Sequence, residues 1–180
     1  HDHAQALHDA LVRNGFVPGE PESIMIGEAA LLAVDVPLPK GIHLRRVTSE
    51  PDVRALSAMQ EEVFGGGFAE EMADALLRRL GFGDGMELWV AEAGGEIVSS
   101  GRLEPVPATE FAGIWGGATR PEWRGRGIYR ALTAARARSA LVLGKRLIHS
   151  DSTEVSRPIL ERAGLVEVST TTPYLWVTGG

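Results

Sequence analysis

Residues 115–132 read WGGATRPEWRGRGIYRAL, and this stretch decides the fold. Its pattern predicts the end of a strand, a turn at Pro121, an Arg-Gly loop and then a helix that begins at Ile128. The first backbone N–H groups of a helix have no intrahelical partners, and the helix dipole adds about half a positive charge there. A strand, a loop and a helix start in this order therefore predict a binding site for an anion.

The loop supplies both glycine and arginine. Gly125 and Gly127 let the main chain approach a ligand closely, and Arg124 and Arg126 bring positive charge to the same place. A P-loop is excluded because no Gly-Lys-Ser or Gly-Lys-Thr follows, and the three-glycine spacing of a dinucleotide fingerprint is absent. The pattern favours a pyrophosphate carried by another kind of ligand.

The Arg-Gly pair has a second interpretation, as a solvated turn or an RNA-binding patch. The chain has 18 Lys and Arg against 24 Asp and Glu, a formal net charge of −6, and the pair is not repeated. Proteins held mainly by nucleic-acid phosphates usually carry a basic excess. We therefore expect no nucleic-acid partner. The net negative charge is more compatible with a cationic substrate than with an anionic one.

The composition is that of an ordinary globular chain. Of the 180 residues, 44% are hydrophobic and 23% are charged, which is enough for one buried core or a core with a small appendage. The chain has no cysteine, which excludes disulfides, thiolate nucleophiles and the common structural zinc sites. No apolar run approaches the roughly 20 residues of a membrane span, and the first residues lack the pattern of a secretory signal. We expect a cytoplasmic protein with no metal and no membrane partner.

Hydrophobic periodicity and turn residues predict the other elements. The apolar spacing of Ile128 and Leu132 predicts a long helix with Arg130, Arg136 and Arg138 available to solvent. The element order predicts an α/β (α+β) fold with a mixed, mostly antiparallel central sheet flanked by helices. The predicted strands lie at residues 24–26, 42–47, 87–91, 97–103, 111–119, 146–150, 165–168 and 172–178, and the predicted helices at residues 4–14, 49–64, 68–80, 128–143 and 156–163.

A connector with two prolines, Pro37 and Pro39, predicts a domain boundary. We expect residues 1–40 to form a helix-strand appendage and residues 41–180 to form the main domain. The appendage is too small to fold alone.

Residues 124–129, RGRGIY, resemble the acetyl-CoA motif of the GNAT superfamily of N-acetyltransferases, which is Arg or Gln, two residues, Gly, one residue, and Gly or Ala. The preceding TRPEWRG is similar to the family's strand end and proline turn, and PILERAGLVEV to its closing helix and strand. The element order over residues 42–178 is that of the whole family fold. Tyr129 departs from the motif, because the family has a small residue there. The resemblance implies a GNAT-like acyl-CoA N-acyltransferase fold.

The resemblance also implies a reaction. An acetyl group would pass from acetyl-CoA, the co-substrate, to a primary amine of a small molecule or a protein, by direct attack and without an acyl-enzyme. The pantetheine arm would pair with the strand end at Gly117, Ala118 and Thr119, where a backbone N–H would hold the developing oxyanion. The other cofactor-binding residues that the resemblance implies are Arg124, Gly125, Arg126, Gly127, Ile128, Tyr129 and Ser156.

The usual catalytic residues of the family cannot be transferred to this chain. Gly113 stands where some members carry a Glu base, and Leu160 stands where many carry a Tyr acid. Glu104, at the end of the preceding strand, is our first candidate for the base, and Glu110 is the second. Either carboxylate has the plainer interpretation of a solvated loop residue.

The remaining catalytic candidates are hydroxyl groups. Tyr129 and Tyr174 are the only tyrosines and are candidate proton donors to the leaving thiolate. Ser156 opens the last predicted helix, where an N-cap serine would look the same. His149 has the plainer interpretation of a partly buried core histidine. The missing Glu and Tyr leave an alternative function open, which is a catalytically silent CoA-binding or partner-binding domain.

Residues 11–17, LVRNGFV, echo residues 160–166, LERAGLV, in a helix, glycine and strand pattern. The echo indicates either a remnant of a second acetyltransferase-like half or a coincidence of a short match. We expect residues 1–40 to cover a sheet edge or the acceptor cleft, and a homodimer is one alternative for the assembly.

Overall fold

The computed structural model describes residues 2–176, which divide into two compact units. The larger unit is Ile26–Ser150. The smaller unit joins the two ends of the chain, up to Met25 and from Asp151 onward. The helices are α1 (Asp2–Arg13), α2 (Ala29–Leu32), α3 (Glu50–Phe64), α4 (Ala69–Leu80), α5 (Ile128–Val142) and α6 (Arg157–Arg162), with a 3-10 turn at Pro121–Trp123.

Seven strands form the main sheet, in the order β3-β4-β5-β6-β7-β2-β8, and β1 pairs with β9 in a separate two-stranded sheet. From β3 to β6 the neighbours run antiparallel, whereas β6 and β7 run parallel. The sheet is therefore mixed, and together with its flanking helices it confirms the predicted fold class. The strands are β1 (Phe16–Pro18), β2 (Glu22–Glu28), β3 (Ile42–Val47), β4 (Glu87–Ala93), β5 (Glu96–Pro105), β6 (Phe111–Thr119), β7 (Leu147–Ser152), β8 (Val166–Thr171) and β9 (Tyr174–Trp176).

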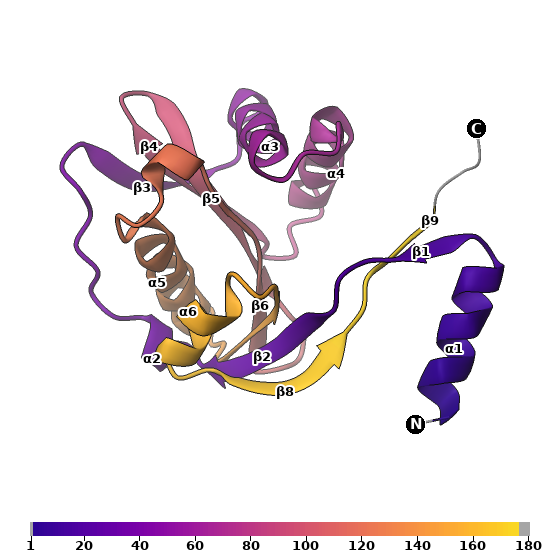
Figure 1. Ribbon diagram of the computed structural model, residues 1–180. Helices are drawn as coiled ribbons and strands as arrows, with labels where there is room; N and C mark the ends of the chain where they lie inside the picture. The colour runs from indigo at the N-terminus through magenta and orange to yellow at the C-terminus, as the bar shows by residue number, and fades with distance from the viewer. Residues whose placement is uncertain (1, 177–180) are drawn as a thin grey trace. The chain divides into compact units, whose positions relative to one another are not determined.

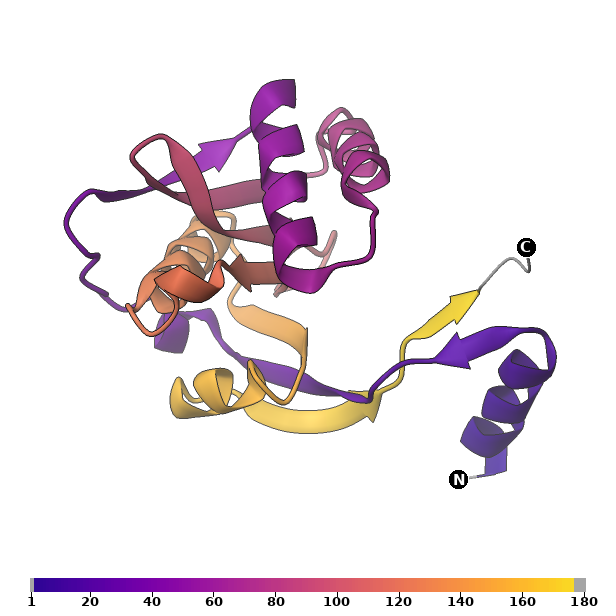
Figure 2. The same ribbon diagram turned by 45° about the horizontal axis from the view of Figure 1, so that its top comes forward.

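Within the larger unit, helices cover both faces of the sheet (Figure 1). Helices α3 and α4 lie side by side on one face, and α5 lies on the other (Figures 1 and 2). The short helix α2, which the sequence pattern did not predict, packs beside α5. The buried core under α3 and α4 includes Val47, Val53, Leu56, Met59, Leu76, Leu88, Val90 and Ala118.

Ser49 caps the start of α3. Its Oγ accepts a hydrogen bond from Asp52 N at 3.4 Å and donates one to Asp52 Oδ2 at 2.8 Å. Arg45 on β3 donates two further hydrogen bonds to the same carboxylate, at 2.8 and 2.9 Å. These hydrogen bonds, that of Arg45 first, lower the pKa of Asp52 from 3.8 to about 2. The first turn of α3 is thus tied to the sheet through one carboxylate.

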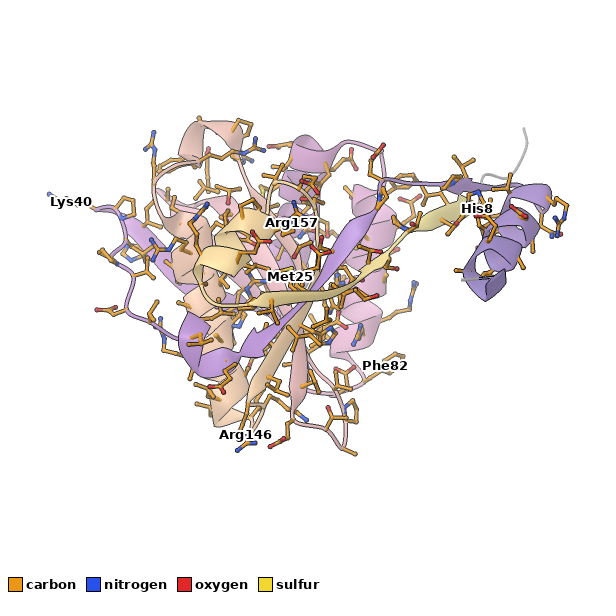
Figure 3. All side chains as sticks on the ribbon, turned by 60° about the horizontal axis from the view of Figure 1, so that its bottom comes forward. His8, Met25, Lys40, Phe82, Arg146 and Arg157 are labelled. Carbon is orange, nitrogen blue, oxygen red and sulfur yellow. The ribbon has the colours of Figure 1, made fainter. Side chains whose placement is uncertain are left out.

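The smaller unit brings the two ends of the chain together. Val17 on β1 lies opposite Leu175 on β9. His8 on α1, labelled in Figure 3, makes a 2.7 Å hydrogen bond with the Tyr174 hydroxyl. The predicted strand at residues 24–26 is the middle of β2, which the sheet order places between β7 and β8.

One prediction for α5 was wrong. Arg130 and Arg138 are exposed as expected, but the side chain of Arg136 is only 1% exposed. The apolar spacing identified one buried face of the helix, whereas the sheet and α2 together cover more than one face. Small side chains such as Ala137 make this close packing possible, and they carry no signal about which face they occupy.

Candidate functional site

Strands β6 and β7 part in the middle of β6. They pair in parallel over three positions, the last of which is Gly113↔His149. Within the described part of the larger unit the pairing does not continue along the rest of β6, which runs to Thr119. One edge of the last residues of β6 therefore has no neighbouring strand within the described part of this unit.

One hydrogen bond fixes the backbone directions at the end of β6. Arg120 N donates to Val98 O on β5 at 3.0 Å. Because N–H groups alternate in direction along a strand, the N–H of Ala118 points toward β5 and that of Thr119 points away from it. Thr119 thus presents a backbone donor on the side where β6 has parted from β7.

Strand β6 bulges at Gly116 and Gly117. The register shifts between Ser100 and Arg102 on β5, so that Gly101 alone lies opposite the two glycines. Gly116 has φ +58°, a left-handed conformation that favours glycine. The bulge changes the direction of the strand at the start of the segment Gly117, Ala118 and Thr119, which was predicted to pair with the pantetheine arm.

The Arg-Gly loop leaves the start of α5 open. Gly125 and Gly127 have φ values of +72° and +78°, and a Cβ at Gly125 would meet nothing within 4 Å. Gly127 is the N-cap of α5, with no side-chain hydrogen bond to the helix start and no acidic residue in the first turn. The first N–H groups of this 15-residue helix therefore keep no side-chain acceptor of their own, and an anionic group fits there.

The two arginines of the loop are anchored differently. Arg124 donates from Nε to Thr119 O at 3.0 Å, which ties the loop to the end of β6. The guanidinium of Arg126 lies over the ring of Trp123, 4.8 Å from its centroid. Both arginine side chains belong to exposed residues. Ile128, the next predicted binding residue, is 1% exposed and packs in the core with its side chain.

Tyr129 turns its ring back toward β6. A Cβ at Gly117 would lie 2.7 Å from the ring carbon Cε2 and 3.4 Å from the hydroxyl oxygen, so only glycine leaves room for the ring. The hydroxyl interacts with the guanidinium of Arg136. The departure of Tyr129 from the small residue of the motif is thus matched by the missing side chain at Gly117.

Glu104 lies on β5 directly opposite Gly113 on β6. Its carboxylate pairs with Arg79 on α4, at 2.8 Å, and with Arg102 on its own strand. The side chain is 15% exposed. The structure therefore places the first candidate base across from the position where it was expected to substitute for a missing Glu, and holds it in two ion pairs.

The space beside Gly113 is filled by Trp115. A Cβ at Gly113 would lie 2.7 Å from the indole Cε2. The indole meets the ring of His149 edge to face, with 5.2 Å between centroids, and Phe111 meets the same imidazole at 6.1 Å. A side chain at position 113 is therefore incompatible with this aromatic cluster.

The other catalytic candidates lie elsewhere. Glu110 precedes β6, at the opposite end from Thr119, and pairs with Arg146 at 2.7 Å; Arg146 is labelled in Figure 3. Ser156 belongs to the smaller unit, where its hydroxyl donates to Thr153 O at 3.3 Å and makes no cap to α6. In that unit the Tyr174 hydroxyl is engaged with His8.

Two polar residues that contact the bulge were missed by the sequence analysis. Gln60 on α3 donates to Gly116 O at 2.8 Å, and Arg136 on α5 donates to Trp115 O at 3.5 Å. Neither is part of a motif, and both occupy helix positions that a solvated face would also explain. The signal that could have found them is the presence of glycine at positions 101, 116 and 117 of two strands. Glycines there leave space into which long side chains from the helices can reach.

Within residues 2–176, no group of three or more His, Asp or Glu side chains is arranged to hold a metal ion. Over the same residues, no helix combines the length and the apolar character that a membrane span requires.

Comparison with known proteins finds a matching family and similar folds. The model of the acetyltransferase (GNAT) family matches residues 53–164. A search of curated protein sequences finds no match to the chain. Among solved structures, a GCN5-related N-acetyltransferase from Kribbella flavida is 18% identical with a TM-score of 0.66, over 97% of this chain and 64% of that chain. This chain therefore spans less than two thirds of that protein.

Two further structures have the same fold. A GCN5-related N-acetyltransferase from Sphaerobacter thermophilus is 21% identical with a TM-score of 0.66, over 94% of this chain and 55% of that chain. A predicted acetyltransferase from Clostridium acetobutylicum, solved with acetyl-CoA, is 16% identical with a TM-score of 0.61, over 71% of this chain and 91% of that chain.

Proposed function

The chain belongs to the GNAT acetyltransferase family, and we propose that it transfers an acetyl group from acetyl-CoA to a primary amine of a small molecule or a protein. The observation that carries the proposal is the junction of β6 with α5. There an open helix start, two loop arginines and an unpaired strand edge meet within a few residues. A pyrophosphate and an extended pantetheine arm require those three features side by side.

In this proposal the backbone holds the co-substrate. The N–H groups at the start of α5, with Arg124, Gly125, Arg126 and Gly127, bind the pyrophosphate. The N–H of Thr119 points to the side where β6 is unpaired and donates to the extended arm, with Gly117 and Ala118 setting the path of the strand. Acetyl-CoA supplies the thioester, and a donor on this strand edge stabilises the negative charge that develops on its carbonyl oxygen.

The proton transfers are assigned to two side chains. Glu104 takes a proton from the substrate ammonium, so that the neutral amine forms the new C–N bond to the acetyl carbon. The C–S bond breaks, Tyr129 gives its hydroxyl proton to the departing thiolate, and the proton that the new amide nitrogen loses restores the tyrosine. Ser156 is kept as a residue that contacts the co-substrate, and its test is a Ser156→Ala variant, for which we expect a higher KM for acetyl-CoA. We assign the activity to the cytoplasm and name no macromolecular partner beyond a protein amine.

Replacement of Gly127 tests the pyrophosphate site. Gly127→Glu places a carboxylate at the open helix start, and we expect it to abolish the protection that acetyl-CoA gives against thermal unfolding. That protection is about 2.7 kcal/mol at a concentration 100-fold above Kd. Gly144→Glu is the matched control, because Gly144 follows the other end of the same helix, has φ +74° and has nothing within 4 Å of its Cβ position. Protection that persists in Gly127→Glu refutes the assignment.

Turnover is tested by the release of free thiol from acetyl-CoA with a panel of amines. We expect Glu104→Gln to lower kcat by about 100-fold, whereas Glu71→Gln, at an exposed position on α4, leaves kcat unchanged. Thermal unfolding of both variants separates a catalytic effect from the loss of the Arg79 ion pair.

A catalytically silent CoA-binding domain is the second candidate function. It is favoured by the two ion pairs that hold Glu104 and by the indole that fills the space at Gly113. Binding of acetyl-CoA without thiol release on a broad amine panel would decide for this second function.

A further inference from the structure

Arg136 is a buried cation in the middle of α5. Its side chain is 1% exposed. Its Nε donates to Leu132 O at 3.3 Å, and its Nη2 donates to Thr133 Oγ1 at 3.1 Å. Among the described residues its partners are carbonyl and hydroxyl oxygens, and none is a carboxylate.

The same guanidinium reaches both strands that flank the bulge. Its Nη1 donates to Arg102 O at 3.3 Å and to Trp115 O at 3.5 Å, and these two residues lie opposite each other on β5 and β6. A Cβ at Gly101 would lie 2.5 Å from that nitrogen, so the glycine is what admits the side chain. Arg136 thereby fixes the separation of the strands on one side of the bulge.

Gln60 contacts the bulge from the opposite face of the sheet. Its Nε2 donates to Gly116 O at 2.8 Å and to Ser100 Oγ at 3.1 Å. The two helices that flank the sheet, α3 and α5, thus each send one polar side chain to the backbone of the bulge. Side chains from two separate helices thus hold the backbone at Gly116, whose positive φ is a conformation that only glycine adopts readily.

No carboxylate among the described residues compensates for the burial of the Arg136 guanidinium. Burial lowers the pKa of Arg136, and the tyrosine hydroxyl opposes that effect. A buried cation without a carboxylate is a weak source of stability, since a well-packed apolar side chain serves as well. Its presence indicates another role.

We propose that Arg136 is a positioning residue of the acetyl-transfer site, which holds the β6 bulge in register. The bulge then delivers the Thr119 N–H to the unpaired edge of β6. This inference rests on the proposed function for its catalytic consequence, and on geometry alone for the backbone of β6.

The first experiment measures the backbone without requiring activity. Amide hydrogen exchange of residues 112–120 is followed in Arg136→Lys, which keeps the charge but cannot span both carbonyls and the tyrosine. We expect exchange about tenfold faster than in the wild type over this segment. Arg138→Met, an exposed position on the same helix, is the control. Wild-type exchange in Arg136→Lys overturns the positioning of the bulge.

The second experiment measures kcat and the KM for acetyl-CoA in Arg136→Lys. We expect kcat to fall by at least about tenfold with KM little changed, because the displaced bulge no longer presents the Thr119 N–H. A wild-type kcat in Arg136→Lys overturns the catalytic consequence of the positioning. Arg136→Met, where it folds, gives the same readout without the charge.

The two proposals fail separately. A wild-type chain that releases no thiol with any amine refutes acetyl transfer and, with it, the catalytic consequence of Arg136. The exchange experiment, repeated with and without acetyl-CoA, still decides whether Arg136 holds the bulge.

Discussion

The indole of Trp115 occupies the space that a side chain at Gly113 would need. A Cβ at Gly113 would lie 2.7 Å from the indole Cε2. Gly113→Ala should therefore lower the free energy of unfolding by about 1–3 kcal/mol. In a Trp115→Ala background the same change should cost almost nothing, because the space is then empty. Urea unfolding of the four proteins measures the coupling, and equal costs in both backgrounds would contradict the overlap.

The same geometry predicts that a carboxylate cannot simply be restored at this position. Gly113→Glu should lower stability and should give no gain in kcat, since the indole blocks the position and Glu104 already lies opposite. Thiol release at saturating acetyl-CoA is the measurement, and a gain in kcat would show that the chain lacks a base.

Single residues were the scale at which sequence reasoning was weakest. The Arg-Gly loop was found because glycine and arginine at those spacings have few explanations. Arg136 was assigned to solvent because an arginine on an alanine-rich helix usually is exposed. Its burial depends on the missing side chain at Gly101, 35 positions earlier in the chain (136 minus 101), which no local pattern reveals.

At the scale of elements, the cap of α3 makes a prediction about pH. The pKa of Asp52 is about 2 in the folded chain and 3.8 in the unfolded reference, so its contribution to stability is complete above pH 3.8 and is lost as the pH falls through 2. Asp52→Asn should cost up to about 1 kcal/mol at pH 7, and this cost should disappear as the pH falls through 2. Urea unfolding at a series of pH values measures the difference, and a cost that is independent of pH would contradict this account.

Long elements were predicted with nearly correct ends, and short ones were missed. Ser49 and Gly65 set the ends of α3 through a cap and a left-handed glycine, signals that act within a few residues. The four residues of α2 and the three of β1 are too few to show a period. They form because neighbouring elements hold them, as the hydrogen bond from Ala29 N to Arg146 O at 2.8 Å illustrates.

At the scale of the whole molecule, deletion of residues 1–40 tests what they contribute to folding. We propose that residues 1–40 complete the sheet, since β2 stands between β7 and β8 in its order. A chain that begins at residue 41 should fail to fold, whereas one that begins at residue 22 should fold with a lower Tm, because it keeps β2 and loses only α1 and β1. Circular dichroism and size-exclusion chromatography decide. A chain of residues 41–180 with the wild-type Tm would contradict the proposal.

The place of β2 has a consequence for how the chain reaches its native state. β2 ends at Glu28, and its neighbours β7 and β8 begin at Leu147 and Val166. On the ribosome β2 must wait until β7 and β8 have been synthesised before its neighbours exist. Such distant pairing slows folding, because a long loop must close before any contact compensates for the lost entropy. Refolding of the chain should therefore be slow for its size, and a circular permutant of residues 1–180 that joins residue 180 to residue 1 and begins after β2 should refold faster.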